Sequence, residues 1–114
     1  MRKLRIMPIA KTDIEYWKLT DEKKYQKPKR MTEQLRTTPK TGIGKPEALK
    51  HKLSGLWSRR IDHENRLVYS FDDETAYIWQ ARFHYVNVPD EEMRTETIAD
   101  LDTGPEREKP QDTS

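Results

Sequence analysis

This 114-residue chain contains five residues whose side chains could together exchange protons and bind a phosphate. They are Glu47, Arg60, Arg66, His84 and Tyr85. A carboxylate can accept the proton of a ribose 2′-OH, and an imidazole can protonate a leaving 5′-oxygen. Guanidinium groups can stabilise the charge that builds on a phosphate. The residue types therefore favour cleavage of RNA by acid–base chemistry. The three histidines do not have metal-ligand spacing, so we expect neither a metal nor another cofactor.

The charge of the chain is divided unevenly. The formal net charge is only +2, from 22 basic and 20 acidic residues. Residues 86–114 contain nine acidic and three basic residues, a charge of −6, which leaves +8 on residues 1–85. A basic body suits a polyanionic partner, although ordinary solubility would also explain it. The chain has no cysteine, and no apolar run approaches the roughly 20 residues that span a membrane, so we expect a cytoplasmic protein without membrane contact.

Hydrophobic periodicity predicts the elements that position these residues. Alternation predicts a strand over residues 2–8, and helical spacing predicts helices over 10–19 and 20–38. Pro28 is expected to kink or restart the second helix. A short helix is predicted from Pro46 to His51. Three strands rich in aromatic and β-branched residues are predicted over 56–61, 65–71 and 75–85.

Period-two alternation predicts which strand residues share a face of the sheet. It places Arg60, Arg66 and His84 together on an open, polar face. The opposite faces are apolar and are expected to meet the two helices. They include Trp57, Leu67, Tyr69, Tyr77 and Trp79. A bulge in any strand would change this assignment beyond the bulged residue.

Several runs of sequence carry a resemblance to a known family. They are Gly44-Lys45-Pro46-Glu47-Ala48-Leu49-Lys50-His51, Leu53-Ser54-Gly55-Leu56-Trp57-Ser58-Arg59-Arg60-Ile61, Arg66-Leu67-Val68-Tyr69 and Arg82-Phe83-His84-Tyr85. At this spacing they resemble the Txe/YoeB branch of the RelE-type toxins, over roughly residues 2–85. The resemblance implies an α+β, RelE-like fold. In that fold two N-terminal helices pack on one face of a four-stranded, mainly antiparallel sheet, in the order β-α-α-β-β-β.

The resemblance also implies a function and a role for each site residue. The function is that of a type II toxin that cleaves mRNA on the ribosome and so blocks translation, with 2′-OH attack and a 2′,3′-cyclic phosphate product. Glu47 takes the position of the general base, His84 of the general acid and Arg66 of the arginine that stabilises the transition state. Arg60 matches a second phosphate-facing arginine, and Tyr85 helps to place the substrate. Contacts to RNA are expected from the neighbouring cations Lys45, Lys50, His51, Lys52 and Arg59.

The same resemblance implies a set of partners and leaves an alternative open. The expected partners are an acidic, YefM-like antitoxin, the ribosome and its mRNA, with operator DNA reached only through the antitoxin; a homodimer stays open. The alternative function is that of an inactive relative which only binds RNA or the antitoxin. Pro28 and the extra C-terminal residues favour it, whereas the intact Glu47, Arg66 and His84 favour the enzyme.

The chain divides into a toxin-like domain over residues 1–85 and an acidic extension over 86–114. Typical members of the family end at the His-Tyr pair, whereas 29 residues follow Tyr85 here. Their composition predicts disorder, with at most one weak amphipathic turn around Met93, Ile98 and Leu101. The extension is expected either to compete weakly with RNA for the basic body or to be inert.

Overall fold

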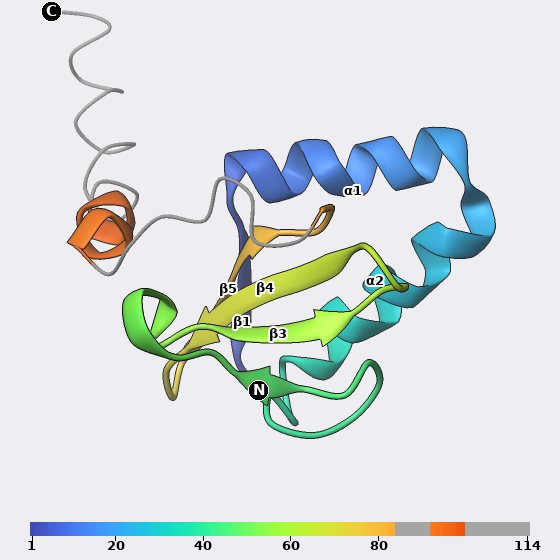
Figure 1. The fold of residues 1–114 in the computed structure, drawn as a ribbon. Coiled ribbons are helices and arrows are strands. Elements are labelled where there is room, and N and C mark those ends of the chain that lie inside the picture. The colour runs from blue at the N-terminus through green and yellow to red at the C-terminus, as the bar shows by residue number, and fades with distance from the viewer. Residues whose placement is uncertain (84–91, 100–114) are drawn as a thin grey trace, which may run out of the picture.

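The computed structural model describes residues 1–83 and 92–99, which form an α+β fold (Figure 1). A helix covers residues 92–99 of the acidic extension. No helix in these two stretches is long and apolar enough to cross a membrane. The labelled elements are β1 (Lys3–Ile6), α1 (Pro8–Thr20), α2 (Glu22–Gln34), β2 (Glu47–Ala48), the 3₁₀ helix η1 (His51–Leu53), β3 (Trp57–Arg60), β4 (Arg66–Phe71) and β5 (Thr75–Gln80).

The sheet has five strands in the order β1-β5-β4-β3-β2, of which only the β1–β5 pair is parallel. The predicted count of four is therefore wrong by one strand. The extra strand is β2, which occupies part of the predicted helix from Pro46 to His51. A helix of one or two turns gains little without tertiary packing, whereas residues 47 and 48 pair with β3.

The second N-terminal helix begins as local capping rules require, but it continues through an internal proline. Asp21 caps α2, and its side chain accepts a hydrogen bond from Lys24 N at 3.1 Å. Pro28 lies inside α2 and is buried, but the helix runs on to Gln34, so the predicted restart does not occur. The Thr32 hydroxyl donates to the carbonyl of Pro28 at 2.8 Å within the same stretch.

Both helices cover one face of the sheet, as predicted. The main core joins Ala10 of α1 and Met31 of α2 to buried strand residues. The strand residues are Leu67, Tyr69, Ala76 and Ile78, with Ile61 and Ala81 from the chain just beyond the strands. The other face carries a second apolar cluster, and so it is less polar than expected. Its buried members are Met7, Leu56, Val68, Tyr77 and Trp79.

Tyr77 and Trp79 lie on the face opposite to the predicted one, because Ala76 and Ile78 take the helix-facing positions of β5, and a bulge follows them. In the β4–β5 pair Tyr69 lies opposite Ile78, but Val68 lies opposite Gln80, so Trp79 is the extra residue. An extra residue reverses the alternation beyond it. The last strand also ends at Gln80 and not at Tyr85. Sequence alternation alone could therefore not assign the faces of β5.

Candidate active site

The sheet register brings three of the predicted site residues onto one face. Glu47 lies opposite Ser58 in the β2–β3 pair, and Arg60 lies opposite Arg66 in the β3–β4 pair. Directly opposed residues of an antiparallel pair point to the same side, and so do residues two positions apart on one strand. The two pairs therefore form adjacent rows, about 7 Å apart along the strands. They face away from α1 and α2, because Val68, opposite Ser58, belongs to the second cluster.

Glu47 is exposed on an edge strand of only two residues. The approach to this strand depends on Gly44, whose φ is +85° and whose carbonyl accepts a hydrogen bond from Arg60 N at 2.7 Å. A Cβ on Gly44 would lie 2.9 Å from the Arg60 carbonyl oxygen and would also collide with Met31. Glycine is therefore needed for the close approach that holds this loop against the end of β3.

Arg66 and Arg60 present their charges differently. The Arg66 guanidinium is partly buried, and its Nη1 donates to the carbonyls of Asp62 (2.8 Å), His63 (3.2 Å) and Asn65 (3.2 Å). These bonds restrict a side chain that otherwise has about 2 kcal/mol of rotamer entropy. Arg60 is exposed. Arg66 is therefore oriented by the protein itself, whereas Arg60 lies in solvent.

Arg59 does not contact solvent, and its prediction as an RNA contact is wrong. Its side chain is fully buried, and its Nε donates to the Tyr69 hydroxyl at 3.3 Å. It lies on the helix-facing side of β3, as its position next to Arg60 requires. The guanidinium anchors the loop before β2 to the sheet. Its Nη atoms donate to Gln34 Oε1 (2.6 Å) and to the carbonyls of Thr38 (2.7 Å), Thr41 (2.9 Å) and Ile43 (3.3 Å).

The other four basic residues predicted to contact RNA are exposed around Glu47: Lys45, Lys50, His51 and Lys52. Two of them, Lys45 and His51, have φ values of +52° and +58°. Such values are uncommon for residues other than glycine and persist where the surrounding structure fixes the backbone. The loop on both sides of Glu47 thus presents positive charge from a defined backbone.

His84 and Tyr85 lie outside the described residues, but the segment that leads to them is described as far as Phe83. Side chains of α1 hold this segment at Ala81, because Asp13 Oδ2 accepts from Ala81 N at 3.0 Å. Trp17 Nε1 donates to the Ala81 carbonyl at 2.7 Å. Burial raises the pKa of Asp13, against the opposing effects of the Ala81 N–H and the Arg82 charge.

Three bonds hold the backbone of Phe83 itself, where φ is +65°. Phe83 N donates to Asn65 Oδ1 at 2.7 Å. The Phe83 carbonyl accepts from Arg66 N at 2.9 Å and from Gln80 Nε2 at 3.1 Å. Sequence reasoning missed Asn65 and Gln80, because their partners lie far along the chain or on irregular backbone. The Asp-x-x-Asn turn pattern was the available signal for Asn65.

Asp62 organises the turn between β3 and β4. Its Oδ1 accepts from Glu64 N and Asn65 N at 2.9 and 2.8 Å, and its Oδ2 pairs with Lys24 Nζ at 2.9 Å. The Asn65 amide donates to both carboxylate oxygens, at 2.9 and 3.1 Å. Burial pushes the pKa of Asp62 upward, but these hydrogen bonds and the Lys24 charge outweigh it and lower the pKa to about 2. The carboxylate is therefore ionised throughout the neutral range.

The helix of residues 92–99 contacts the chain at Ser54, just after the basic residues Lys50, His51 and Lys52. Arg94 is buried, and its Nη2 donates to the Ser54 carbonyl at 2.8 Å. Ile98 packs against the second cluster. Lys50, His51 and Lys52 stay exposed beside this contact. The described part of the extension thus covers apolar surface and leaves the neighbouring cations open.

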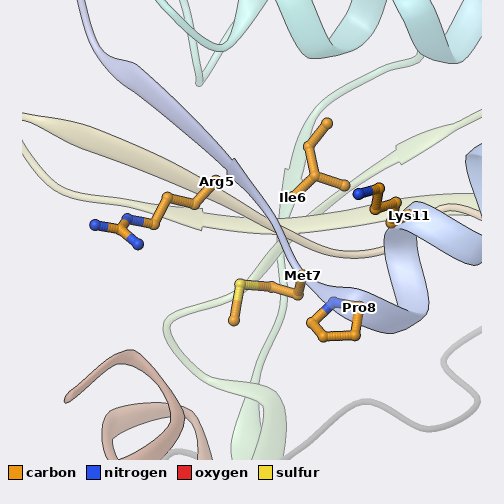
Figure 2. A pocket seen from close by; sticks show the side chains of 5 residues that line it. All are labelled: Arg5, Ile6, Met7, Pro8 and Lys11. Carbon is orange, nitrogen blue, oxygen red and sulfur yellow. The ribbon is translucent and has the colours of Figure 1, made fainter. Parts of the chain in front are cut away.

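An open hollow of about 460 Å³ lies elsewhere, where β1 passes into α1. Figure 2 shows its lining side chains, with Ile6 and Met7 on opposite sides of the strand. The lining residues are Arg5, Ile6, Met7, Pro8 and Lys11. None of the predicted site residues contributes to it, so we place the candidate site on the sheet face that carries Glu47, Arg60 and Arg66.

Comparison with known proteins finds similar toxins. Toxin YoeB of Escherichia coli K12 is 48% identical over 73 residues, which are 64% of this chain and 87% of the relative. The YoeB dimer of Staphylococcus aureus has a TM-score of 0.67 at 39% identity, covering 74% of this chain and 98% of that one. The S. aureus YoeB–YefM complex has a TM-score of 0.66 at 37% identity, covering 75% and 99%.

The match to the family extends over most of the described body. Residues 8–85 match the sequence profile of a YoeB-like toxin of a bacterial type II toxin–antitoxin system. The profile spans both helices, all the antiparallel strands and the five predicted catalytic residues. The chain therefore belongs to the YoeB-like toxins of bacterial type II toxin–antitoxin systems.

Proposed function

We propose that this toxin is a ribosome-dependent mRNA endoribonuclease that works without a metal. Glu47 removes the proton from a ribose 2′-OH, and the 2′-oxygen attacks the adjacent phosphorus. The P–O5′ bond breaks as His84 donates a proton to the leaving 5′-oxygen, which leaves a 2′,3′-cyclic phosphate and a 5′-OH. Arg66 and Arg60 stabilise the extra negative charge on the phosphate, and Tyr85 helps to place the substrate.

The observation that carries the proposal is the placement of Glu47 and two arginines in adjacent rows on one face. A base beside a pair of cations suits a phosphate whose neighbouring 2′-OH must be deprotonated. The exposed cations around Glu47 extend this face into a surface that could follow an RNA backbone. Lys45, Lys50, His51 and Lys52 are the proposed contacts.

The proposed partners follow from the family and from the charge of the body. The S. aureus relative was solved both as a dimer and as a YoeB–YefM complex. We infer that this chain binds an acidic, YefM-like antitoxin, and that operator DNA is reached only through it. The +8 charge of residues 1–85 suits both an acidic antitoxin and the ribosome with its mRNA. We infer a cytoplasmic toxin, because the proposed partners are found there. A homodimer is the assembly to test first.

Cleavage of mRNA in a purified translation system, with and without ribosomes, tests the proposal. Glu47→Gln, His84→Ala and Arg66→Ala should each lower the ribosome-dependent rate by about 10²–10⁴-fold. Their combined effect should be less than additive, since the three groups act on one step. Thermal unfolding of each variant controls for folding. Normal cleavage by folded Glu47→Gln and His84→Ala proteins would leave the inactive, binding-only relative as the better account.

A further inference from the structure

We propose that Asn65 is a positioning residue for catalysis: it fixes the backbone from which His84 departs. The inference rests on the proposed role of His84 as general acid. Asn65 itself need not touch the substrate, because its side chain acts through the backbone of Phe83. The same turn also orients Arg66, so one short segment holds both the proposed phosphate-binding cation and Phe83, the residue before His84.

The first step of the argument is that the sheet no longer holds the chain at Phe83. The strand β5 ends at Gln80, three residues earlier. Phe83 has φ of +65° and is 45% exposed as a residue, so apolar burial does not fix it. A left-handed conformation at a non-glycine residue costs about 1 kcal/mol or more and needs support from its surroundings. Among the described residues, that support comes from Asn65, Arg66 and Gln80.

The second step is that the Asn65 amide can have only one orientation. Its Nδ2 donates to both oxygens of the Asp62 carboxylate, at 2.9 and 3.1 Å. Its Oδ1 must then point the other way, where it accepts from Phe83 N at 2.7 Å. A flipped amide would place Oδ1 against a carboxylate and Nδ2 against an N–H. Asp62, held by Lys24 of α2, thus sets the direction of the bond that Asn65 makes to Phe83.

The third step is that this turn serves Arg66 at the same time. Arg66 Nη1 donates to the carbonyls of Asp62 and Asn65, and Arg66 N donates to the carbonyl of Phe83. A displacement of the turn would therefore move the guanidinium and the residue before His84 together. Misplacement of a catalytic group by about 1 Å can cost about 10²-fold in rate. We expect Asn65→Ala to lower cleavage by about 10–100-fold.

A substrate with a better leaving group tests whether Asn65 acts through the acid. In RNA with a bridging sulfur in place of the 5′-oxygen, the leaving thiolate departs without a proton, so general-acid catalysis contributes little. His84→Ala should then lose much less activity on the thio substrate than on ordinary RNA. Asn65→Ala should show the same selective recovery, with a smaller overall loss. A merely structural defect would lower cleavage of both substrates equally.

A matched control and a second variant keep the result interpretable. Asp72→Ala removes a carboxylate with the same turn hydrogen bonds, but at the other end of β4. It should cleave both substrates at the wild-type rate. Asn65→Thr also removes the amide, and it tests the idea should Asn65→Ala fail to fold. Its recovery on the thio substrate should match that of Asn65→Ala.

The outcomes separate this inference from the function on which it rests. Recovery of both His84→Ala and the Asn65 variants on the thio substrate supports both. Recovery of His84→Ala without recovery of the Asn65 variants overturns the positioning role alone, as would wild-type cleavage of ordinary RNA by the Asn65 variants. Failure of His84→Ala to recover would overturn the proposed acid, and the positioning role with it.

Discussion

The turns before and after β4, which begin at Asp62 and Asp72, have the same hydrogen bonds to backbone N–H groups but different roles in the molecule. In the first, Asp62 Oδ1 accepts from the backbone N–H groups two and three residues later, at 2.9 and 2.8 Å. In the second, Asp72 Oδ1 accepts from the corresponding N–H groups, at 2.8 Å each. An aspartate at the start of a turn forms such bonds because its short side chain reaches its own backbone. The local chemistry of the two turns is therefore the same.

The turns differ in what they meet across the molecule. The first reaches Lys24 of α2 through Asp62 and Phe83 through Asn65. At the second, the Asp72 carbonyl accepts from Arg2 at 2.6 Å, and Thr75 stands where the first turn has an asparagine. The first turn thus joins two distant segments beside the candidate site, whereas the second meets the N-terminal residues at the opposite end of β4. The comparison teaches that turn formation and site positioning are separable properties of one short motif.

The largest expected effect is on stability, and it tests whether the fold depends on the buried guanidinium of Arg59. Arg59→Leu leaves the carbonyls of loop 38–43 and the Tyr69 hydroxyl without their donor. Each buried group without a partner costs about 1–3 kcal/mol, so we expect a loss of about 3 kcal/mol or more in the free energy of unfolding. Urea unfolding measures it. Arg60→Leu is the matched control, because an exposed neighbour should change stability by no more than about 0.5 kcal/mol.

A smaller effect should separate the two turns directly. Asp62→Ala and Asp72→Ala each remove two hydrogen bonds to backbone N–H groups, and Asp62→Ala also removes the bonds from the Asn65 amide and the pair with Lys24. We expect a loss of roughly 1–2 kcal/mol in the free energy of unfolding for Asp72→Ala and at least as much for Asp62→Ala. Only Asp62→Ala should also lower cleavage, by about 10-fold, since Asn65 then loses its anchor. Unfolding curves and cleavage rates of the two proteins give the comparison. Equal cleavage losses in both would mean that the site does not depend on the identity of the turn.

The smallest expected effect is a pH dependence of the free energy of unfolding, caused by Asp62 in the first turn. The pKa of Asp62 falls from its ordinary value of 3.8 to about 2 in the folded protein. The ionised carboxylate therefore stabilises the fold at pH values above about 4, and this contribution is lost as the pH falls toward 2. Because the side chain is partly solvated, we expect only about 1 kcal/mol. The stability difference between wild type and Asp62→Asn should shrink over that range, and a constant difference would contradict the assignment.

Patterns within single segments predicted much of the fold. Both helices and the three central strands follow from local periodicity. The family's motif placed Glu47, Arg60 and Arg66 in one site, and the register puts them on one face. The bulge at Trp79 and the strand β2 escaped prediction, because both depend on how a neighbouring strand is paired. The roles of His84 and Tyr85 stay predictions, since both residues lie outside the described structure.

The neighbours Arg59 and Arg60 show how much the sequence by itself can determine about a side chain. The sequence determined that they point to opposite faces, because alternation is a property of any extended strand. Only the tertiary structure decided that one is a buried anchor and the other a solvent-exposed cation. That outcome depends on carbonyl groups of a loop some twenty residues earlier, which the fold gathers around the Arg59 guanidinium. A buried charge is stable only where such partners converge, and no local pattern records their convergence.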